Sequence, residues 1–328
     1  PASMTKIMTV YVVFDRIINT DLSINSECII SAKAYKMGGS RTFLEIDDKV
    51  SIDDLLKGII IQSGNDASVA LAECLSGTEA DFSKLMNVYG DRLGLKNTNF
   101  VNSSGWPEDN HYSTVYDLGI LSNALIKNFP NLYSYFKMED FSYNSINQPN
   151  RNKLLYKFQG ADGLKTGYTK KSGWGISGSA IRGDRRITVV INGTNSSRSR
   201  LNESNYLLNW AFNETNPKKI LTKGQIIKNV DVWLGNKPTV NLIIPKDIIS
   251  ILSFDQMQLI ESKISYNKPA NAPIKKGDEL GKIEILITGK DPIIVPLVAE
   301  KNIGIINPIF KFFAAIKYLL FGTSLDEV

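Results

Sequence analysis

Three short strings place hydroxyl, amine and amide side chains at spacings suited to acyl transfer. They are Ser3-Met4-Thr5-Lys6 near the start of the chain, Ser63-Gly64-Asn65, and Lys165-Thr166-Gly167. A serine three residues before a lysine is common by chance, but the ordered set SxxK, SxN and KTG is not. Together the strings supply a nucleophile, two candidate proton carriers and polar groups that could hold an acyl substrate.

The first string lies in a segment that is apolar nearly all round. Residues 1 to about 19 therefore predict a core helix with Ser3 at its N-terminal end. Residues i and i+3 share a helix face, so the amine of Lys6 would lie near the Ser3 hydroxyl. A buried lysine loses hydration, which favours the neutral form that can take a proton from serine. Taken alone, however, Ser3 could be only a helix cap and Lys6 only a solvated side chain.

The second string falls where a helix over 53–62, capped by Ser51, is expected to stop. On its own, Ser63-Gly64-Asn65 could be no more than a glycine-containing helix end. Beside the first string, Ser63 could relay a proton between the leaving group and a lysine. The Asn65 amide could hydrogen-bond a substrate amide.

The third string adds Lys165, a second cation for the same pocket. Two facing lysines disfavour double protonation, which supports one neutral base at pH 7. Gly167 is expected to leave room for a substrate backbone that lies along the strand as an added strand. Alone, this string would be a strand residue followed by a bend.

The surrounding pattern predicts an α/β (α+β) catalytic domain over residues 1–213, with helices packed on an antiparallel sheet. Three alternating runs predict its adjacent strands: 163–168, 174–179 and 186–191, the last two separated by a hairpin turn at 182–185. Further helices are expected over 66–75, 79–93 closed by Gly94, 114–127 capped by Ser113, and 199–212.

The character of the chain changes twice more. Short β-like runs broken by Gly, Pro and Asn predict a small all-β domain over 214–302, whose last hairpin turns at 289–292. The tail, 303–328, places apolar side chains on one helix face and two lysines towards the other. It is too short to span a bilayer and favours a helix lying in the membrane interface. Packing on its own protein is the alternative.

The composition excludes some functions. The 328 residues carry a net charge of +5 with scattered lysines, which argues against a nucleic-acid groove. Cys28 and Cys74 are too few for a disulfide scaffold, and their pairing cannot be read from the sequence. Buried free thiols are expected, because free cysteine usually packs as a small hydrophobic residue.

The three motifs, with their order and wide spacing, resemble the penicillin-binding proteins and serine β-lactamases. The strings around them are similar to the low-molecular-mass D-alanyl-D-alanine carboxypeptidases of the S11 peptidase type, and the similarity covers almost the whole chain, including the β domain and the tail. The strings that carry this resemblance are 1–6, 61–67, 100–103, 110–113 and 162–167.

The resemblance implies a reaction on a peptidoglycan stem peptide. Ser3 would attack the carbonyl between two terminal D-alanines, D-alanine would leave, and water would hydrolyse the acyl-enzyme. Backbone N–H groups of Ser3 and Tyr168 would hold the oxyanion. β-Lactam antibiotics would acylate the same serine, and neither a metal nor an organic cofactor is needed.

A carboxypeptidase must also recognise a free terminal carboxylate. Thr166 offers a hydroxyl, and Arg200 matches the family's arginine behind the KTG strand. An arginine fork can bond both carboxylate oxygens, although Arg200 could also be a surface residue. Tyr168 stands where many relatives carry histidine, which puts the rate and pH profile in doubt. Arg151 and the single histidine, His111, are expected to be structural.

The resemblance also implies a location, in the periplasm on the outer face of the bacterial cytoplasmic membrane, with the tail as the anchor. The first strands of the family's catalytic domain are not found ahead of Ser3. The chain is therefore expected to lack its own N-terminus, so that a missing signal peptide is not evidence for the cytoplasm.

Three other functions use the same motifs. A β-lactamase would need a dedicated deacylation base, and no Glu-x-x-Leu-Asn string is present. A D,D-endopeptidase or transpeptidase would act on cross-linked peptides with the same residues. A non-catalytic penicillin-binding wall module is disfavoured because all motif residues are intact.

Overall fold

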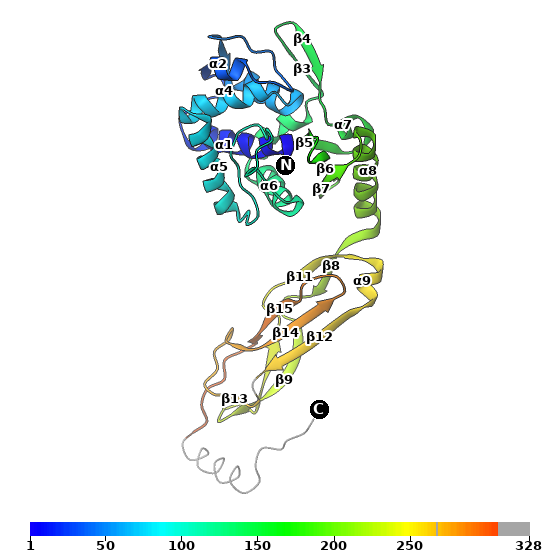
Figure 1. Ribbon diagram of the computed structural model, residues 1–328. Coiled ribbons are helices and arrows are strands. Elements are labelled where there is room, and N and C mark those ends of the chain that lie inside the picture. Colours follow the sequence, from blue (N-terminus) through cyan, green and yellow to red (C-terminus); the bar gives the residue numbers. More distant parts are fainter. Residues whose placement is uncertain (267, 308–328) are drawn as a thin grey trace. The chain divides into compact units, whose positions relative to one another are not determined.

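The computed structural model describes residues 1–266 and 268–307 (Figure 1). The chain divides into two compact units, Pro1–Phe212 and a second that begins at Asn213. The first unit mixes helices with small antiparallel sheets, and the described residues of the second lie mostly in strands. The expected fold class, an α+β catalytic domain with an all-β C-terminal domain, is confirmed.

The N-terminal helix lies inside the first unit. A 3-10 turn, η1 (Ala2–Thr5), leads directly into α1 (Lys6–Asn19), as the apolar pattern predicts. Every residue from Lys6 to Phe14 is buried, because α1 contacts α4, α5 and α6. A helix packed on all sides cannot rotate, so its first turn holds Ser3 and Lys6 in one orientation.

The other helices of the first unit surround α1 or cover the sheet. They are α2 (Ala32–Tyr35), α3 (Ile52–Lys57), α4 (Asn65–Ser76), α5 (Glu79–Leu93), α6 (Val115–Asn128), α7 (Leu154–Lys157) and α8 (Ser197–Glu214). The hydroxyl of Ser51 caps α3 as expected. The predicted cap of α6 is wrong by one residue, because Thr114 accepts the N–H of Asp117 while the Ser113 hydroxyl bonds Thr98.

The helix expected over 53–62 changes type before it ends. The α-helical part stops at Lys57, and a wider π-helical turn, η2 (Gly58–Gln62), continues to Ser63. Ser63 then adopts a left-handed backbone conformation with φ of 66°, which non-glycine residues rarely adopt. Such conformations gather at functional sites, where the surrounding structure holds them in place.

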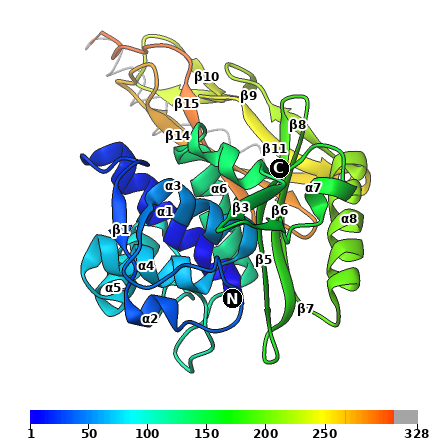
Figure 2. The same ribbon diagram turned by 90° about the horizontal axis from the view of Figure 1, so that it is seen from above.

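The central sheet has the three antiparallel strands that the alternating runs predict. Its order is β5 (Ala161–Thr169), β6 (Gly173–Arg182) and β7 (Arg185–Thr194), with Lys165 opposite Ser177. One face packs on α7 and α8, and the other meets α6, where Ser177 and Ser122 are 2.7 Å apart (Figure 2). Strand β5, which carries the KTG string, forms one edge of this sheet.

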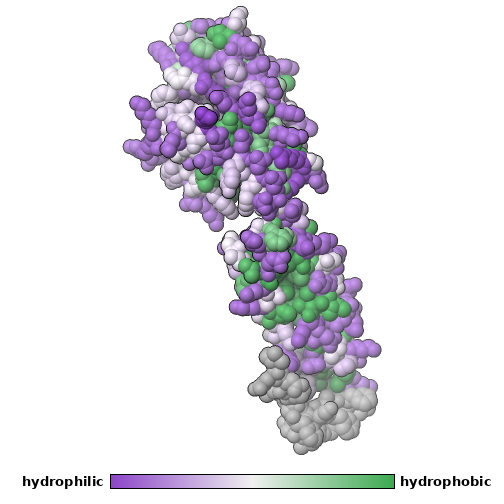
Figure 3. All heavy atoms as spheres, turned by 90° about the vertical axis from the view of Figure 1, so that its right-hand side faces the viewer, coloured by the Kyte–Doolittle hydropathy of each residue, from purple (hydrophilic) through white to green (hydrophobic). Residues whose placement is uncertain are grey.

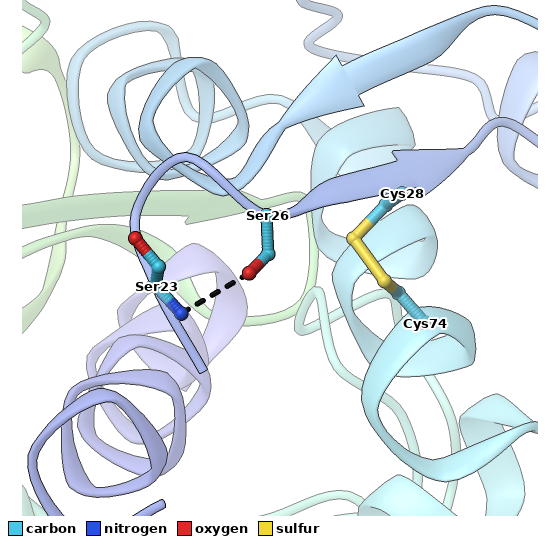
Figure 4. The surroundings of a disulfide bond; sticks show 4 residues. All are labelled: Ser23, Ser26, Cys28 and Cys74. Atoms are coloured by element: carbon cyan, nitrogen blue, oxygen red, sulfur yellow. Dashed lines mark hydrogen bonds between the residues drawn. A yellow bond between two sulfur atoms is a disulfide. The ribbon is translucent and has the colours of Figure 1, made fainter. Parts of the chain in front are cut away.

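Two antiparallel strand pairs complete the first unit: β1 (Glu27–Ile29) with β2 (Lys49–Ser51), which α2 separates in sequence, and the hairpin of β3 (Asp140–Tyr143) with β4 (Ile146–Pro149). Cys28 in β1 forms a disulfide with Cys74 in α4 (Figure 4). The expectation of free thiols is therefore wrong. The two cysteines are 46 positions apart in sequence, and only the packing of α4 against β1 brings them together.

In the second unit, the residues that the structure describes form a six-stranded sheet and a separate two-stranded pair around an aliphatic core. The sheet order is β12 (Ile260–Tyr266), β14 (Glu279–Ile287), β15 (Ile293–Ala299), β10 (Thr239–Ile243), β9 (Ile226–Trp233) and β13 (Ala270–Asn271). The pair is β8 (Thr215–Leu221) with β11 (Ile248–Ser253), and a short helix, α9 (Phe254–Gln258), follows β11. The last hairpin, between β14 and β15, turns at 289–292 as expected.

Residues 303–307 still take part in the pairing of the second unit. Ile303 pairs with Ile274, and the N–H of Ile306 donates to the carbonyl of Leu234. The expected start of the tail at 303 thus falls on residues that pair inside the β unit. The remainder of the predicted amphipathic tail, 308–328, lies outside the described residues. In the part of the chain that is described, no helix has the length and apolar character needed to cross a membrane.

Candidate active site

The amine of Lys6 lies at the centre of the site. Its Nζ atom is 3.0 Å from the Ser3 hydroxyl, 2.7 Å from Oδ1 of Asn65 and 2.6 Å from the carbonyl oxygen of Ser104. The side chain is fully buried, and the loss of hydration lowers its pKa to about 7. A large share of Lys6 is therefore uncharged at neutral pH.

The side chain of Asn65 is held at both ends. Its Oδ1 accepts from Lys6, and its Nδ2 donates to the carbonyl of Gly38 at 2.8 Å. Its backbone N–H also donates to the carbonyl of Ser40 at 2.8 Å. Asn65 was expected to contact a substrate amide. It does line the cleft, but the contacts that the structure provides are with Lys6 and with the loop of residues 38–44.

That loop is organised by a buried carboxylate. Asp66, fully buried at the start of α4, accepts hydrogen bonds from the backbone N–H groups of Thr42, Phe43 and Leu44. Its negative charge also opposes the fall in the pKa of Lys6. Asp66, the residue that follows Asn65 in α4, therefore anchors the loop that contacts Asn65.

A second serine–lysine pair faces the first. Lys165 Nζ lies 2.9 Å from the Ser63 hydroxyl and 3.1 Å from the carbonyl of Thr166. Burial is the main cause that lowers the pKa of Lys165 well below its usual range, and the charge of Lys6 adds to it. The structure thus brings the SxxK, SxN and KTG strings together, as the sequence predicts.

Gly167 lies where β5 passes close to η1. A Cβ atom at this position would lie 3.0 Å from the carbonyl oxygen of Pro1 and 3.2 Å from the backbone nitrogen of Ser3. The missing side chain therefore allows β5 to pass close beside η1, and the expected room for a substrate backbone stays a prediction. This close approach brings the backbone of Ser3 next to that of Gly167 and Tyr168.

Arg200 is a buried cation for which the described residues provide no counter-ion. Its side chain is 6% exposed, and its guanidinium carbon lies 5.3 Å from the centre of the Trp174 ring. Its guanidinium donates to the Gly175 carbonyl and the Ser197 hydroxyl, and within the described residues no carboxylate forms an ion pair with it. Burial lowers its pKa to about 10, so it stays charged at neutral pH and is suited to an incoming anion.

The cleft has two hollows that meet at Ser3. The first, here called the Arg200 hollow, has a volume of about 480 Å³ and is lined by Ser3, Ser63, Thr166, Tyr168, Trp174 and Arg200. The second, here called the Trp106 hollow, has a volume of about 750 Å³ and is lined by Ser3, Ser40, Asn65, Trp106, Lys170 and Lys171. Tyr168 is half exposed between them, with its ring 4.3 Å from that of Trp174.

Two further residues singled out in the sequence lie nearby. His111 accepts the N–H of Val101 on Nδ1, contacts the Thr5 hydroxyl through Nε2, and has its pKa lowered to about 4 by burial. His111 therefore supports η1, the turn that carries Ser3. Arg151 donates to the carbonyl of Gln62 but also lines both hollows, so it contributes positive charge to the cleft as well.

Some parts of the site carry no signal in the sequence. The carbonyls of Ser104 and Gly38 act through the backbone, which any residue could supply. Trp106 and Trp174 line the hollows, and only the turn-rich character of 102–110 points to that segment. In the described part of the chain, no group of His, Cys, Asp and Glu side chains is arranged to hold a metal ion.

A serine hydroxyl against a buried lysine amine, with a second serine–lysine pair across the cleft, is the geometry of serine–lysine acyl-transfer enzymes. A family model described as D-alanyl-D-alanine carboxypeptidase matches residues 1–195. A model described as the C-terminal domain of penicillin-binding protein 5 matches residues 216–304. The chain belongs to the D-alanyl-D-alanine carboxypeptidase family.

Relatives and solved structures agree over nearly the whole chain. The D-alanyl-D-alanine carboxypeptidase DacC of Escherichia coli is 37% identical over 311 residues, which cover 92% of this chain and 78% of that protein. The crystal structure of DacD from Francisella tularensis is similar with a TM-score of 0.82 and 28% identity, covering 93% of this chain and 88% of that one. Penicillin-binding protein 5 from Haemophilus influenzae gives a TM-score of 0.76 and 34% identity, with 93% and 90% coverage.

Proposed function

We propose that this protein removes the terminal D-alanine from peptidoglycan stem pentapeptides through an acyl-enzyme on Ser3. As a member of its family it is a serine-type D-alanyl-D-alanine carboxypeptidase and a penicillin-binding protein. The observation that carries the assignment of Ser3 is the position of the buried Lys6 amine, 3.0 Å from the Ser3 hydroxyl.

The neighbours of Lys6 determine where its lone pair points. A neutral amine has two N–H bonds and one lone pair. The amide oxygen of Asn65 and the carbonyl of Ser104 can only accept, so they take the two N–H bonds. The lone pair is left facing Ser3, the one contact that can donate a proton. Lys6 is therefore oriented as the general base that activates the Ser3 oxygen.

Acylation then follows with all protons accounted for. The Ser3 oxygen bonds to the carbonyl carbon between the two D-alanines, and its proton passes to Lys6. The backbone N–H groups of Ser3 and Tyr168, which the close approach at Gly167 brings together, hold the oxyanion. The C–N bond breaks as the proton that Lys6 took from Ser3 is relayed through Lys165 and Ser63 to the departing amine, which leaves Lys6 neutral again. Water then attacks the ester carbonyl and gives its proton to Lys6, and Lys6 returns that proton to the Ser3 oxygen as the peptide acid is released.

The buried charge of Arg200 supports carboxypeptidase specificity. It lines the Arg200 hollow with Thr166 and lacks an ion-pair partner among the described residues. A terminal D-alanine carboxylate would supply the missing negative charge and could bond the Thr166 hydroxyl. The ring carboxylate of a β-lactam would occupy the same place while its amide acylates Ser3.

We also place the protein in the periplasm, on the outer face of the cytoplasmic membrane. Two observations support this location. Disulfides such as Cys28–Cys74 persist in oxidising compartments. The sequence of residues 308–328 has the amphipathic pattern of an interfacial helix. Truncation after Asn307 should abolish flotation with anionic vesicles, and flotation of the truncated protein would reject the tail as the anchor.

The decisive test of the activity is D-alanine release from a synthetic pentapeptide ending in D-Ala-D-Ala. The wild type should release free D-alanine, and both Ser3→Ala and penicillin should stop the release. If penicillin labels the protein but no D-alanine appears, the alternative of a non-catalytic penicillin-binding wall module would be favoured. Release only from cross-linked dimers would favour an endopeptidase, and rapid penicillin turnover alone would favour a β-lactamase.

A further inference from the structure

The carbonyl of Ser104, which accepts a hydrogen bond from the Lys6 amine, belongs to a loop. Residues 101–108 lie outside the helices and strands, so no ladder of backbone hydrogen bonds fixes the direction of this carbonyl. Its oxygen nevertheless lies 2.6 Å from the Lys6 nitrogen and takes one of the two N–H bonds of the neutral amine. The contacts of the preceding residue, Ser103, therefore decide where the Ser104 carbonyl points.

Ser103 is held by a buried carboxylate. Glu79, the first residue of α5, is 9% exposed, and its Oε1 accepts the N–H of Ser103 at 3.1 Å and the Ser103 hydroxyl at 2.8 Å. On α1, nearly one turn beyond Lys6, the Thr9 hydroxyl donates to the carbonyl of Ser103 at 2.6 Å. Hydrogen bonds to an ionised acceptor are about twice as strong as neutral ones, so Glu79 provides the stronger of the two contacts.

The carboxylate of Glu79 stays ionised because its other oxygen has a cationic partner. Oε2 lies 2.7 Å from the amine of Lys33 on α2. Burial alone would raise the pKa of Glu79, but the hydrogen bonds from Lys33 and Ser103 outweigh it and hold this pKa below its ordinary value. An ionised carboxylate can only accept hydrogen bonds, which is what the two donors of Ser103 require.

The simplest role for Glu79 would be to stabilise α5, because acidic residues in the first turn favour a helix through its dipole. The Thr78 hydroxyl, however, already caps α5 by accepting the N–H of Asp81. The bonds of Glu79 leave the helix and reach α2 and the 101–108 loop. Glu79 also lines a polar cavity of about 860 Å³ with Lys33 and Ser104, so water can replace a truncated side chain.

We propose that Glu79 is a positioning residue for acylation: by holding Ser103 it keeps the Ser104 carbonyl on the Lys6 amine, and so keeps the lone pair of Lys6 directed at Ser3. The proposal rests on the proposed function, in which Lys6 is the base. Glu79 lines neither of the two hollows that adjoin Ser3, so it acts through Ser104 and Lys6. Without Glu79 the carbonyl can turn away, and an N–H of Lys6 can then face Ser3 in place of the lone pair.

The negative charge of Glu79 also acts on Lys6. It opposes the fall in the pKa of Lys6 that burial causes, whereas the charge of Arg151 adds to that fall. The titratable and charged groups that face Lys6 from the surrounding elements are Asp66 on α4, Glu79 on α5, Lys165 on β5, Arg151 and His111. Removing the charge of Glu79 alone should therefore lower the pKa of Lys6 and move the pH profile of acylation towards acid.

Two variants separate the charge of Glu79 from its contact with Ser103. Glu79→Gln loses the charge but keeps an oxygen that can accept from Ser103, whereas Glu79→Ala loses both. The second-order rate of acylation by a fluorescent penicillin is measured for each variant from about pH 5.5 to pH 9. The final extent of labelling counts the intact sites, so that each rate is expressed per labelled site.

The two variants should differ in both the height and the position of the pH profile. Glu79→Gln should keep its plateau within about threefold of the wild type, because a neutral hydrogen bond to Ser103 remains. Its rate at pH 6 should lie less far below its plateau than the roughly tenfold expected of the wild type. Glu79→Ala should have a plateau lower by roughly ten- to a hundredfold, because small misplacements of a reacting group cost up to about a hundredfold.

Asp81→Asn is the matched control. Asp81 lies two residues further along α5, bonds Thr78 and Lys84, and is absent from the groups that shift the pKa of Lys6. The control removes an acidic charge from the same end of the same helix and should keep the wild-type plateau and midpoint. A purely structural role of Glu79 would lower the melting temperature and the number of labelled sites, but not the rate per site or the midpoint.

A plateau loss in Glu79→Ala that Glu79→Gln recovers, together with an acid shift in Glu79→Gln and an unchanged control, supports the proposal. A wild-type plateau per labelled site in Glu79→Ala, a loss that Glu79→Gln shares in full, or a midpoint that does not move in Glu79→Gln would overturn it. If Glu79→Ala does not fold, the midpoint of Glu79→Gln decides alone. Failure of the wild type itself to be acylated or to release D-alanine would instead overturn the proposed function.

Discussion

The two compact units bury different kinds of side chain. In the described residues of the second unit, the core is aliphatic and Thr215 is the one buried polar residue. The first unit has an apolar core of its own, yet it also buries Lys6, Lys165, Asp66 and Arg200. On the face seen in Figure 3, the surfaces differ in the opposite sense, since apolar patches are more extensive on the second unit.

This contrast separates what holds the molecule together from what gives it chemistry. Burying an ammonium group costs several kcal/mol unless it is neutralised or paired. The first unit accepts that cost at Lys6 and Lys165, and the burial that is unfavourable for stability is what lowers their pKa values. The second unit has no comparable groups among its described residues, as expected of a region whose interior serves packing alone.

The largest expected effect comes from removing the buried amine of Lys6. Lys6→Met keeps the volume and removes the base, so acylation by a fluorescent penicillin should slow by about a thousandfold or more. The melting temperature should change by only a few degrees, because a buried ionisable amine is replaced by an apolar chain. Labelling at close to the wild-type rate would remove Lys6 from the mechanism.

The converse variant lies in the second unit. Leu297→Ala removes a fully buried side chain from the aliphatic core and should lower the free energy of unfolding of that unit by about 2–5 kcal/mol. Release of D-alanine by the purified variant should stay unchanged at temperatures where the unit remains folded. Chemical denaturation measures the first quantity and a coupled D-alanine assay the second. A matching loss of activity would show that the two interiors are not independent.

The disulfide is the main covalent contribution to stability in the first unit. Cys28→Ala/Cys74→Ala removes a link between positions 46 apart in sequence and should lower the free energy of unfolding by about 2–4 kcal/mol. The site should keep its activity when folded, because neither cysteine lines the cleft. The check is urea denaturation of the double variant beside the wild type without reductant. Equal midpoints would contradict the expectation.

The smallest effect expected is the pH dependence of acylation. Only neutral Lys6 accepts the proton of Ser3, and burial lowers the pKa of Lys6 to about 7. The second-order rate should therefore rise with pH to a plateau above about 8, and at pH 6 it should be roughly tenfold below that plateau. Arg151→Gln removes a cation that lowers this pKa, so the midpoint should move upward. A rate independent of pH from 6 to 8 would disagree with a neutral base.

Features set by local sequence are predicted well. The helix over Glu79–Leu93 has both of its expected ends, because Gly94 closes an amphipathic pattern with a left-handed residue. The pairing of Ser3 with Lys6 follows from helical spacing alone. The meeting of three distant motifs follows only from the resemblance, since no local rule brings Ser63 and Lys165 together.

Features set by packing are missed. The disulfide depends on α4 lying against β1, which spacing does not reveal. The close approach of Gly167 to η1 depends on which element packs beside β5, and the residues around Gly167 do not reveal that element. The ligands of the Lys6 amine include the carbonyl of Ser104, a group that every residue possesses.

The central claim is that the hydroxyl oxygen of Ser3, activated by Lys6, is the atom that becomes acylated. Mass-spectrometric mapping after brief exposure to penicillin tests it directly. The account predicts one stoichiometric adduct on the peptide of residues 1–6, absent from Ser3→Ala and much slower to form in Lys6→Met. An adduct on Ser63, or labelling that persists in Ser3→Ala, would contradict it.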